Sequence, residues 1–105
     1  MSLPVRITPE AEAQILEIEN WWRKNRLAAP DLFINELSES FELLSGAPQI
    51  GHLYRPSPVR GVRRLLLGGT RYHVYYAVVR KEVSVLAVWH AQRGVGPPLR
   101  TSLTG

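Results

Sequence analysis

A histidine and an arginine follow the last apolar run of the chain, in the stretch LAVWHAQRG, residues 86–94. His90 comes directly after the apolar residues, and Arg93 lies just beyond it. A guanidinium can bind two phosphate oxygens at once, and an imidazole can exchange a proton near neutral pH. The stretch is therefore either the end of a core strand that meets water or the strand-borne part of a site that handles phosphates.

Other basic residues flank two further strand-like runs. Arg63 and Arg64 are neighbours, so their side chains point to opposite faces of a strand. If the strands pair tightly, members of three groups share one end of a sheet: Arg63 or Arg64, Arg71 or His73, and His90 or Arg93. Such a cluster suits a phosphodiester. The alternatives are that the histidines are half-buried and bond to the backbone, and that the arginines are ordinary surface charge.

The basic residues are concentrated in the second half of the chain, which has a net charge of +4 overall. Residues 1–50 hold four basic and eight acidic side chains, a balance of −4. Residues 51–105 hold nine basic and one acidic side chain, a balance of +8. A basic half indicates an anionic partner, either nucleic acid or an acidic protein. The alternative is that arginine solvates exposed strand edges.

The composition argues against several kinds of site. The chain has no cysteine, which excludes disulfides and thiolate metal sites. Its three histidines, His52, His73 and His90, lack the close spacing of metal ligands, and no glycine-rich loop precedes a helix. We therefore expect no metal and no cofactor. No apolar stretch is long enough for a signal peptide or a membrane span, so we expect a soluble cytoplasmic protein that does not bind membranes.

Two helices are expected in the first half of the chain. Residues 3–8 predict a short strand, and Thr8 can then cap a helix over residues 9–25. A second helix is expected to begin at Pro30 and to stop at Gly46, over residues 30–46. Because the link between them is short, the helices should form an antiparallel hairpin. Trp21 is expected on the surface of the first helix, where it could be a contact point.

The second half predicts a three-stranded meander. Strand-like runs cover residues 62–67, 72–79 and 83–90, and the short turns between them require neighbouring antiparallel strands. Residues 46–61 hold three prolines and three glycines, which predicts a loop. Residues 94–105 are expected to be a loose tail.

The predicted fold class is α+β, as a single domain over residues 1–105. An N-terminal strand and an antiparallel two-helix hairpin pack on one face of the C-terminal three-strand antiparallel meander, in the order β-α-α-β-β-β. The other face and the edges of the sheet are expected to stay open to a partner.

This order of elements resembles the RelE/ParE superfamily, the small toxins of bacterial type II toxin–antitoxin systems. The stretch VRRLLLGGTRYHVYYAVVRKEVSVLAVWHAQRG is similar to its pattern of an Arg-Arg pair, a tyrosine-rich strand, a short polar turn and a closing VLAVWHxxR. VRITPEAEAQILEIENWW resembles its first strand and helix. The resemblance covers most of residues 3–94, and YHVYYAV and VWHAQRG look closer to the ParE branch than to the RelE branch.

The two branches imply different activities. ParE-like members poison DNA gyrase and lack a recognised nuclease centre, whereas RelE-like members cleave mRNA in the ribosome with basic residues on the sheet. In the second case the resemblance implies that His90 is the general acid or base. Arg64, Arg71 and Arg93 would then hold the phosphate and stabilise charge in the transition state. This pattern is only partly met, because the loop and the second strand of the meander contain no lysine.

In the gyrase case the same kind of residue makes binding contacts, and this chain breaks no bond. The contacts implied for the target or an antitoxin are Arg60, Arg63, Arg64, Arg71, His73, Arg80, Trp89 and Arg93. The resemblance also implies a cognate antitoxin, acidic and folding as it binds, which can form a hetero-oligomer with the toxin.

Three functions follow, in order of preference. The first is a ParE-like toxin that inhibits DNA gyrase and is neutralised by its antitoxin. The second is a RelE-like endonuclease that cleaves mRNA and depends on the ribosome. The third is a non-toxic module that binds an antitoxin or DNA as a co-repressor.

Overall fold

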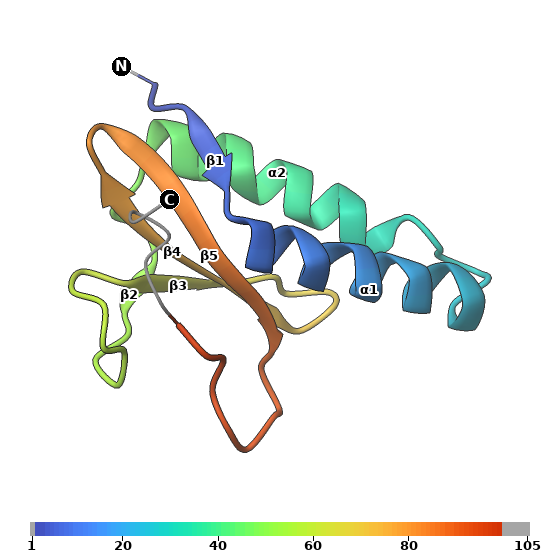
Figure 1. Cartoon of the computed structure of the whole chain (residues 1–105). Helices are drawn as coiled ribbons and strands as arrows, with labels where there is room; N and C mark the ends of the chain where they lie inside the picture. Colours follow the sequence, from blue (N-terminus) through green and yellow to red (C-terminus); the bar gives the residue numbers. More distant parts are fainter. Residues whose placement is uncertain (1, 100–105) are drawn as a thin grey trace.

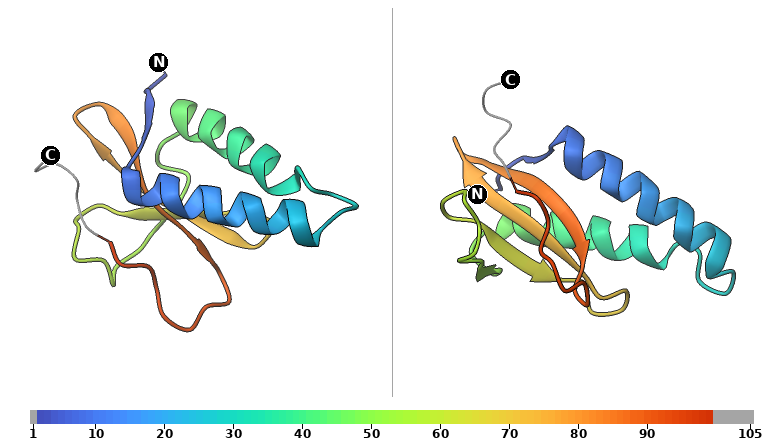
Figure 2. Two further views of the ribbon diagram at one scale, coloured as in Figure 1. Left: turned by 45° about the vertical axis from the view of Figure 1, so that its right-hand side comes forward. Right: turned by 60° about the horizontal axis from the view of Figure 1, so that its bottom comes forward.

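Two helices cover one face of a twisted five-stranded sheet (Figure 1). The computed structural model describes residues 2–99. In chain order the elements are β1 (Val5–Ile7), α1 (Pro9–Asn25), α2 (Leu32–Gly46), β2 (His52–Leu53), β3 (Arg63–Leu66), β4 (Tyr72–Val79) and β5 (Glu82–His90). Figure 2 shows α1 and α2 next to each other on the same face. The predicted order is confirmed, and the short strand β2 is added within the stretch predicted as a loop.

Local sequence signals determine where α1 begins. The Thr8 side chain accepts a hydrogen bond from the Ala11 N–H at 3.2 Å, and Pro9 follows at the start of the helix. The bounds of α1 agree with the prediction. Its buried residues recur at helical spacing and pack into the core between the helices and the sheet: Ala11, Ile15 and Trp22.

α2 begins two residues later than predicted. A turn precedes it, in which the Leu32 N–H donates to the Ala29 carbonyl at 3.3 Å, so Pro30 lies in the link between the helices. Asp31 occupies the N-cap position, but its side chain makes no capping hydrogen bond. One apolar stripe of α2 packs into the core through three buried residues: Phe33, Leu37 and Leu44.

The sheet is mixed, with the strand order β1-β5-β4-β3-β2, and is not wholly antiparallel. The predicted meander is confirmed, since β3, β4 and β5 are antiparallel neighbours. β1 runs parallel to β5 at one edge, with Val5 opposite Val83. Tight turns require antiparallel neighbours, but strands separated by a long crossover can pair in parallel. The direction of β1 in the sheet was therefore not determined by the turns.

A bulge in β5 changes which residues face the helices. The register of β4 against β5 shifts between Tyr75 and Tyr76, which leaves Leu86 as an extra residue in β5. Leu86 and Ala87 consequently both pack on the far face of the sheet, the face away from the helices. Beyond this point the alternation of side chains along β5 is shifted by one residue.

A second apolar cluster covers part of the far face. Its buried members are Val62, Tyr75, Ala77, Leu86, Ala87 and Leu99. Val62 precedes β3 and Leu99 follows β5, so segments outside the sheet cover this face, and the prediction that it stays open is wrong here. Residues 94–99 also differ from the loose tail expected, because Pro97 and Leu99 are buried. Residues 100–105 lie outside the described residues.

A carboxylate on α2 holds the turn between β3 and β4. Glu36 accepts hydrogen bonds from the Gly69 N–H at 2.6 Å, from the Thr70 N–H at 2.9 Å and from the Thr70 hydroxyl at 2.7 Å. A Cβ atom at Gly69 would lie 2.8 Å from a carboxylate oxygen, so glycine permits this close approach. Arg71 completes the turn with a φ of 67°. Glu36 therefore couples the helical layer to one end of the sheet.

The substitution Glu36→Ala should lower the free energy of unfolding by about 1–3 kcal/mol, because it leaves two N–H groups of the turn without their acceptor. Urea unfolding measures the change. Glu39→Ala is the matched control, since Glu39 is exposed on the same helix, and it should change stability by less than about 0.5 kcal/mol. Equal losses in the two variants would contradict the role of Glu36.

Candidate functional site

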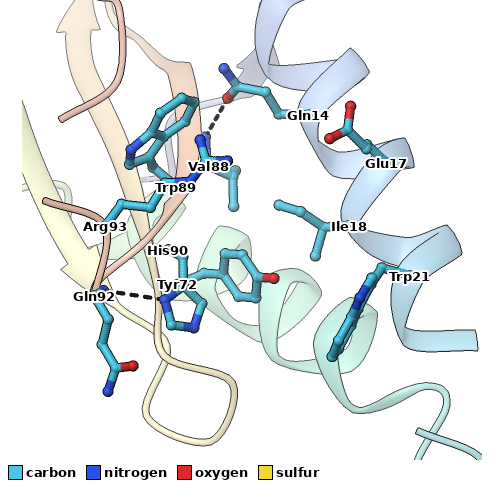
Figure 3. A pocket seen from close by; sticks show the side chains of 10 residues that line it. All are labelled: Gln14, Glu17, Ile18, Trp21, Tyr72, Val88, Trp89, His90, Gln92 and Arg93. Carbon is cyan, nitrogen blue, oxygen red and sulfur yellow. Dashed lines mark hydrogen bonds between the residues drawn. The ribbon is translucent and has the colours of Figure 1, made fainter. Parts of the chain in front are cut away.

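An open groove of about 470 Å³ lies between α1 and the end of β5 (Figure 3). Its walls come from α1, from the first residue of β4, and from the end of β5 with the residues after it. The lining residues are Gln14, Glu17, Ile18, Trp21, Tyr72, Val88, Trp89, His90, Gln92 and Arg93. The groove thus combines four ring-bearing side chains with a carboxylate and a guanidinium.

The shifted alternation of β5 sets the positions of its groove residues. Val88 lies in the core under the helices, and His90 is opposite Tyr72 with ring centroids 4.9 Å apart. The Gln14 side chain accepts a hydrogen bond from the Val88 N–H at 2.8 Å, which ties α1 to β5. Trp89 packs against the second apolar cluster, on the far face of the sheet, but also reaches the groove. The groove therefore follows the part of β5 that extends past the end of β1.

One ring nitrogen of His90, a residue of the groove lining, is engaged by the backbone. Its Nδ1 atom accepts a hydrogen bond from the Gln92 N–H at 3.2 Å. In a neutral imidazole one nitrogen accepts and the other carries the proton, so the proton lies on Nε2. A ring in this state can donate through Nε2, whereas its accepting nitrogen is already occupied.

Two arginines stack on the two tryptophans of the groove. The Arg93 guanidinium lies 4.3 Å from the centroid of the Trp89 ring, and the Trp89 indole N–H donates to the Val95 carbonyl at 2.8 Å. On α1, the Arg26 guanidinium lies 4.9 Å from the Trp21 ring. Stacking on an indole face is worth about 0.5–1 kcal/mol at exposed sites and fixes the direction of the cation.

A second group of basic residues lies on the far face and at the turn beside it. Arg64 donates to the Tyr75 hydroxyl at 3.4 Å, and its guanidinium lies 5.2 Å from the Tyr54 ring. Burial lowers the pKa of His73, and the charges of Arg64 and Arg71 lower it further. We call Arg64, Arg71 and His73 the far-face basic cluster.

Members of the three predicted groups do lie near one end of the sheet, where the Ala91 N–H donates to the Arg71 carbonyl at 2.8 Å, but they lie on different faces. Arg64 and His73 belong to the far-face basic cluster, whereas His90 and Arg93 line the groove. Arg63 points to neither place, because it donates to the Gly51 carbonyl at 2.8 Å and to the Gln49 carbonyl at 3.3 Å. Its role is to hold the loop before β2.

The other two predicted contact residues are exposed. Arg60 is in the loop before β3, and Arg80 is in the turn between β4 and β5, where its φ is 51°. Arg71 and Arg80 thus occupy turns at opposite ends of β4. Both have a left-handed backbone conformation, which makes them a matched pair for comparison.

Of the α1 wall of the groove, the sequence prediction named Trp21 as a contact point and did not assign the other members. The members of this wall are spaced by three or four residues, which places them on one side of a helix: Gln14, Glu17, Ile18 and Trp21. These residues lie beside the buried residues of α1, so a search for helical spacing that went beyond the core residues could have found them. The contact of Gln14 with a strand N–H carries no comparable local signal.

Residues 2–99 contain no metal-binding cluster and no membrane-spanning helix. No three histidine, aspartate or glutamate side chains of this range are grouped so that they could hold a metal ion. None of the helices in the same range has the length and apolar character needed to cross a membrane.

Comparison with known proteins identifies first the fold and then the family. The structure is similar to one described as "Chromosomal ParDE TA system from P. aeruginosa", with a TM-score of 0.69, 22% sequence identity, and coverage of 87% of this chain and 98% of that chain. At this identity the match shows the shared fold. The family described as "ParE toxin of type II toxin-antitoxin system, parDE" matches residues 5–94, and the chain belongs to this family. No curated protein matches the sequence.

The His73 imidazole should titrate below pH 6.5, its ordinary pKa, because burial and two nearby guanidiniums disfavour its charged form. NMR of the imidazole resonances measures this. Because the unfolded chain binds this proton more readily than the native chain, His73 lowers the free energy of unfolding in acid. Its contribution to stability is complete above pH 6.5 and is lost as the pH falls through the lower native pKa.

Arg71→Asn tests the cause of this shift, because asparagine tolerates the left-handed turn conformation and carries no charge. The variant should raise the pKa of His73, whereas Arg80→Asn should leave it unchanged. A native pKa at or above the ordinary value in the unsubstituted chain would contradict the account.

Proposed function

We propose that this protein is a toxin that binds and inhibits DNA gyrase in the cytoplasm, and that a cognate antitoxin neutralises it. The observation that carries the proposal is membership of the ParE toxin family over residues 5–94. The similar structure from P. aeruginosa, described as a ParDE toxin–antitoxin system, supports an antitoxin as partner.

The arrangement of basic residues supports binding rather than cleavage through His90. A general acid or base must reach the same phosphate that the arginines hold. His90 is paired with Tyr72 on the helix side of the sheet, whereas Arg64 contacts Tyr75 on the far face. The placement of His90 and Arg64 on different faces therefore supports binding over cleavage through His90.

The far-face basic cluster is the part of the surface that we assign to the target. Arg64 is held by Tyr54 and Tyr75, so its guanidinium loses little freedom when it meets a carboxylate or phosphate. Arg71 is exposed beside it, in the turn that Glu36 fixes. Fixed positive charges of this kind speed the encounter with an acidic surface and suppress wrong partners.

Induction of the protein without antitoxin should arrest bacterial growth with filamentation and a DNA-damage response. In vitro it should inhibit supercoiling by purified gyrase. Arg71→Asn should weaken inhibition about tenfold, which corresponds to the loss of roughly 1.4 kcal/mol of binding energy. Arg80→Asn, the matched turn control, should inhibit as the unsubstituted chain does.

The absence of any growth arrest would contradict the proposal. Arrest without an effect on supercoiling would remove gyrase as the target. A stable antitoxin complex without arrest would instead support the non-toxic module.

One observation favours an mRNA endonuclease as a second candidate. The far-face basic cluster places a histidine of lowered pKa beside two arginines. Such an imidazole is neutral at pH 7 and can take a proton, while guanidiniums bind the phosphate. In this case His73, rather than His90, would be the general base.

Incubation with translating ribosomes and mRNA tests the second candidate. If the endonuclease is the true activity, cleavage should appear at translated codons, and His73→Gln should slow it by about 100-fold or more. His90→Gln should cleave at the unsubstituted rate. Uncut mRNA under conditions in which gyrase is inhibited would eliminate this candidate.

A further inference from the structure

We infer that the far-face basic cluster and the loop between β2 and β3, residues 54–62, together bind the phosphate backbone of double-stranded DNA. The inference rests on the proposed function and names the chemistry of the target at this surface. The chain contacts the DNA that gyrase holds, and not the enzyme alone.

The two layers of the molecule carry opposite charge. Residues 9–46, which form α1, α2 and the link between them, hold three basic and eight acidic side chains. Residues 47–81, which form β2, β3, β4 and the loops beside them, hold seven basic side chains and no aspartate or glutamate. A long basic stretch of one sign is the electrostatic footprint of a nucleic-acid interface. A polyanion is therefore attracted to the sheet and repelled by the helices, which orients the chain as it approaches.

The loop between β2 and β3 presents two arginines on a fixed backbone. The Tyr54 N–H donates to the Val62 carbonyl at 2.8 Å and closes the loop. Tyr54 and Val59 pack against the second apolar cluster, so the loop lies on the far face, away from α1 and α2 (Figure 1). Arg55 and Arg60 each follow one of these anchors in the sequence, and both are exposed. A loop that is already ordered loses little entropy when it binds.

The sheet continues the same basic surface. His52 is directly opposite Arg64 in the pairing of β2 with β3, so the two side chains share a face. Arg71 is exposed in the turn at the other end of β3, beside His73. Because its pKa is lowered, His73 is neutral at pH 7 and can donate a hydrogen bond to a phosphate oxygen.

The placement of the arginines favours several phosphates over a single one. Arg60 precedes β3, Arg64 lies within it and Arg71 follows it. The extended stretch from Val62 to Leu67 is roughly 17 Å long, at about 3.4 Å per residue. Charges at both ends and in the middle of such a stretch can each pair with a different phosphate of a continuous backbone.

The affinity of the full-length chain for a labelled DNA duplex, measured by fluorescence anisotropy over a range of salt concentrations, tests the inference. The logarithm of the association constant should fall linearly with the logarithm of salt concentration, by about 0.9 for each phosphate neutralised. Arg60→Gln and Arg71→Asn should each weaken binding about tenfold at low salt and reduce the slope by about 0.9. Lys24→Gln is the matched control, because it removes one charge from the exposed surface of α1, and it should change neither quantity. Circular dichroism establishes that each variant is folded.

Photocross-linking provides the second measurement, in the presence of the target. DNA that contains bromodeoxyuridine should cross-link to this chain when it is mixed with purified gyrase. The yield should fall for Arg60→Gln and Arg71→Asn, and it should be unchanged for Lys24→Gln.

The possible outcomes separate the inference from the proposed function. If the chain inhibits supercoiling but neither binds the duplex nor cross-links to it, the inference is overturned and the proposed function stands. If the two arginine variants bind the duplex as the unsubstituted chain does, the contact lies elsewhere and the inference is also overturned. If an RNA of the same sequence binds more tightly than the DNA, the ligand is RNA, which overturns the inference and supports the endonuclease. If the chain binds DNA as expected but supercoiling continues, the DNA site is confirmed and the proposed function is rejected.

Discussion

Burial of both faces of β4 and β5 is the constraint on which the rest of the structure depends. One face packs under α1 and α2, and the other is covered by the segments around Val62 and Leu99. A strand buried on both sides needs apolar residues at nearly every position, which leaves polar residues only at its ends. The charged residues and histidines of β4 and β5 are accordingly found at the ends of these strands and in the turns beside them.

The bulge at Leu86 decides how those polar residues are divided between the faces. With regular alternation, Ala87 and Trp89 would share the helix side with Val85, and His90 would lie on the far face with His73. The extra residue reverses this assignment beyond the bulge. The groove under α1 and the far-face basic cluster are therefore two separate surfaces, although one short stretch of β5 adjoins both. A single inserted residue thus separates two charged regions that the sequence had suggested were one.

The elements that the sequence predicted well are those with local causes. The Thr8 cap, the short turns of the meander and the end of α2 at Gly46 each depend on residues a few positions apart. The direction of β1, the bulge at Leu86 and the hold of Glu36 on the turn depend on contacts between distant segments. Of the candidate site, the sequence identified the basic residues and the end of β5, but the two faces on which they lie depend on the bulge. Of the α1 wall, the sequence identified Trp21, whereas Gln14 and Glu17 were missed because they resemble an ordinary solvated face.

The hydrogen bond from the Val88 N–H to Gln14 has a consequence for the solubility of the free protein. β1 ends before it reaches this part of β5, and an uncovered strand edge can recruit a strand from another molecule and begin aggregation. The amide oxygen of Gln14 already accepts the hydrogen bond of the Val88 N–H. This edge of β5 therefore offers an incoming strand one fewer free donor. At the other edge of the sheet, β2 is two residues long, so it has few unpaired backbone groups with which another strand could pair. The chain thereby limits the pairing of its sheet edges with other copies of itself.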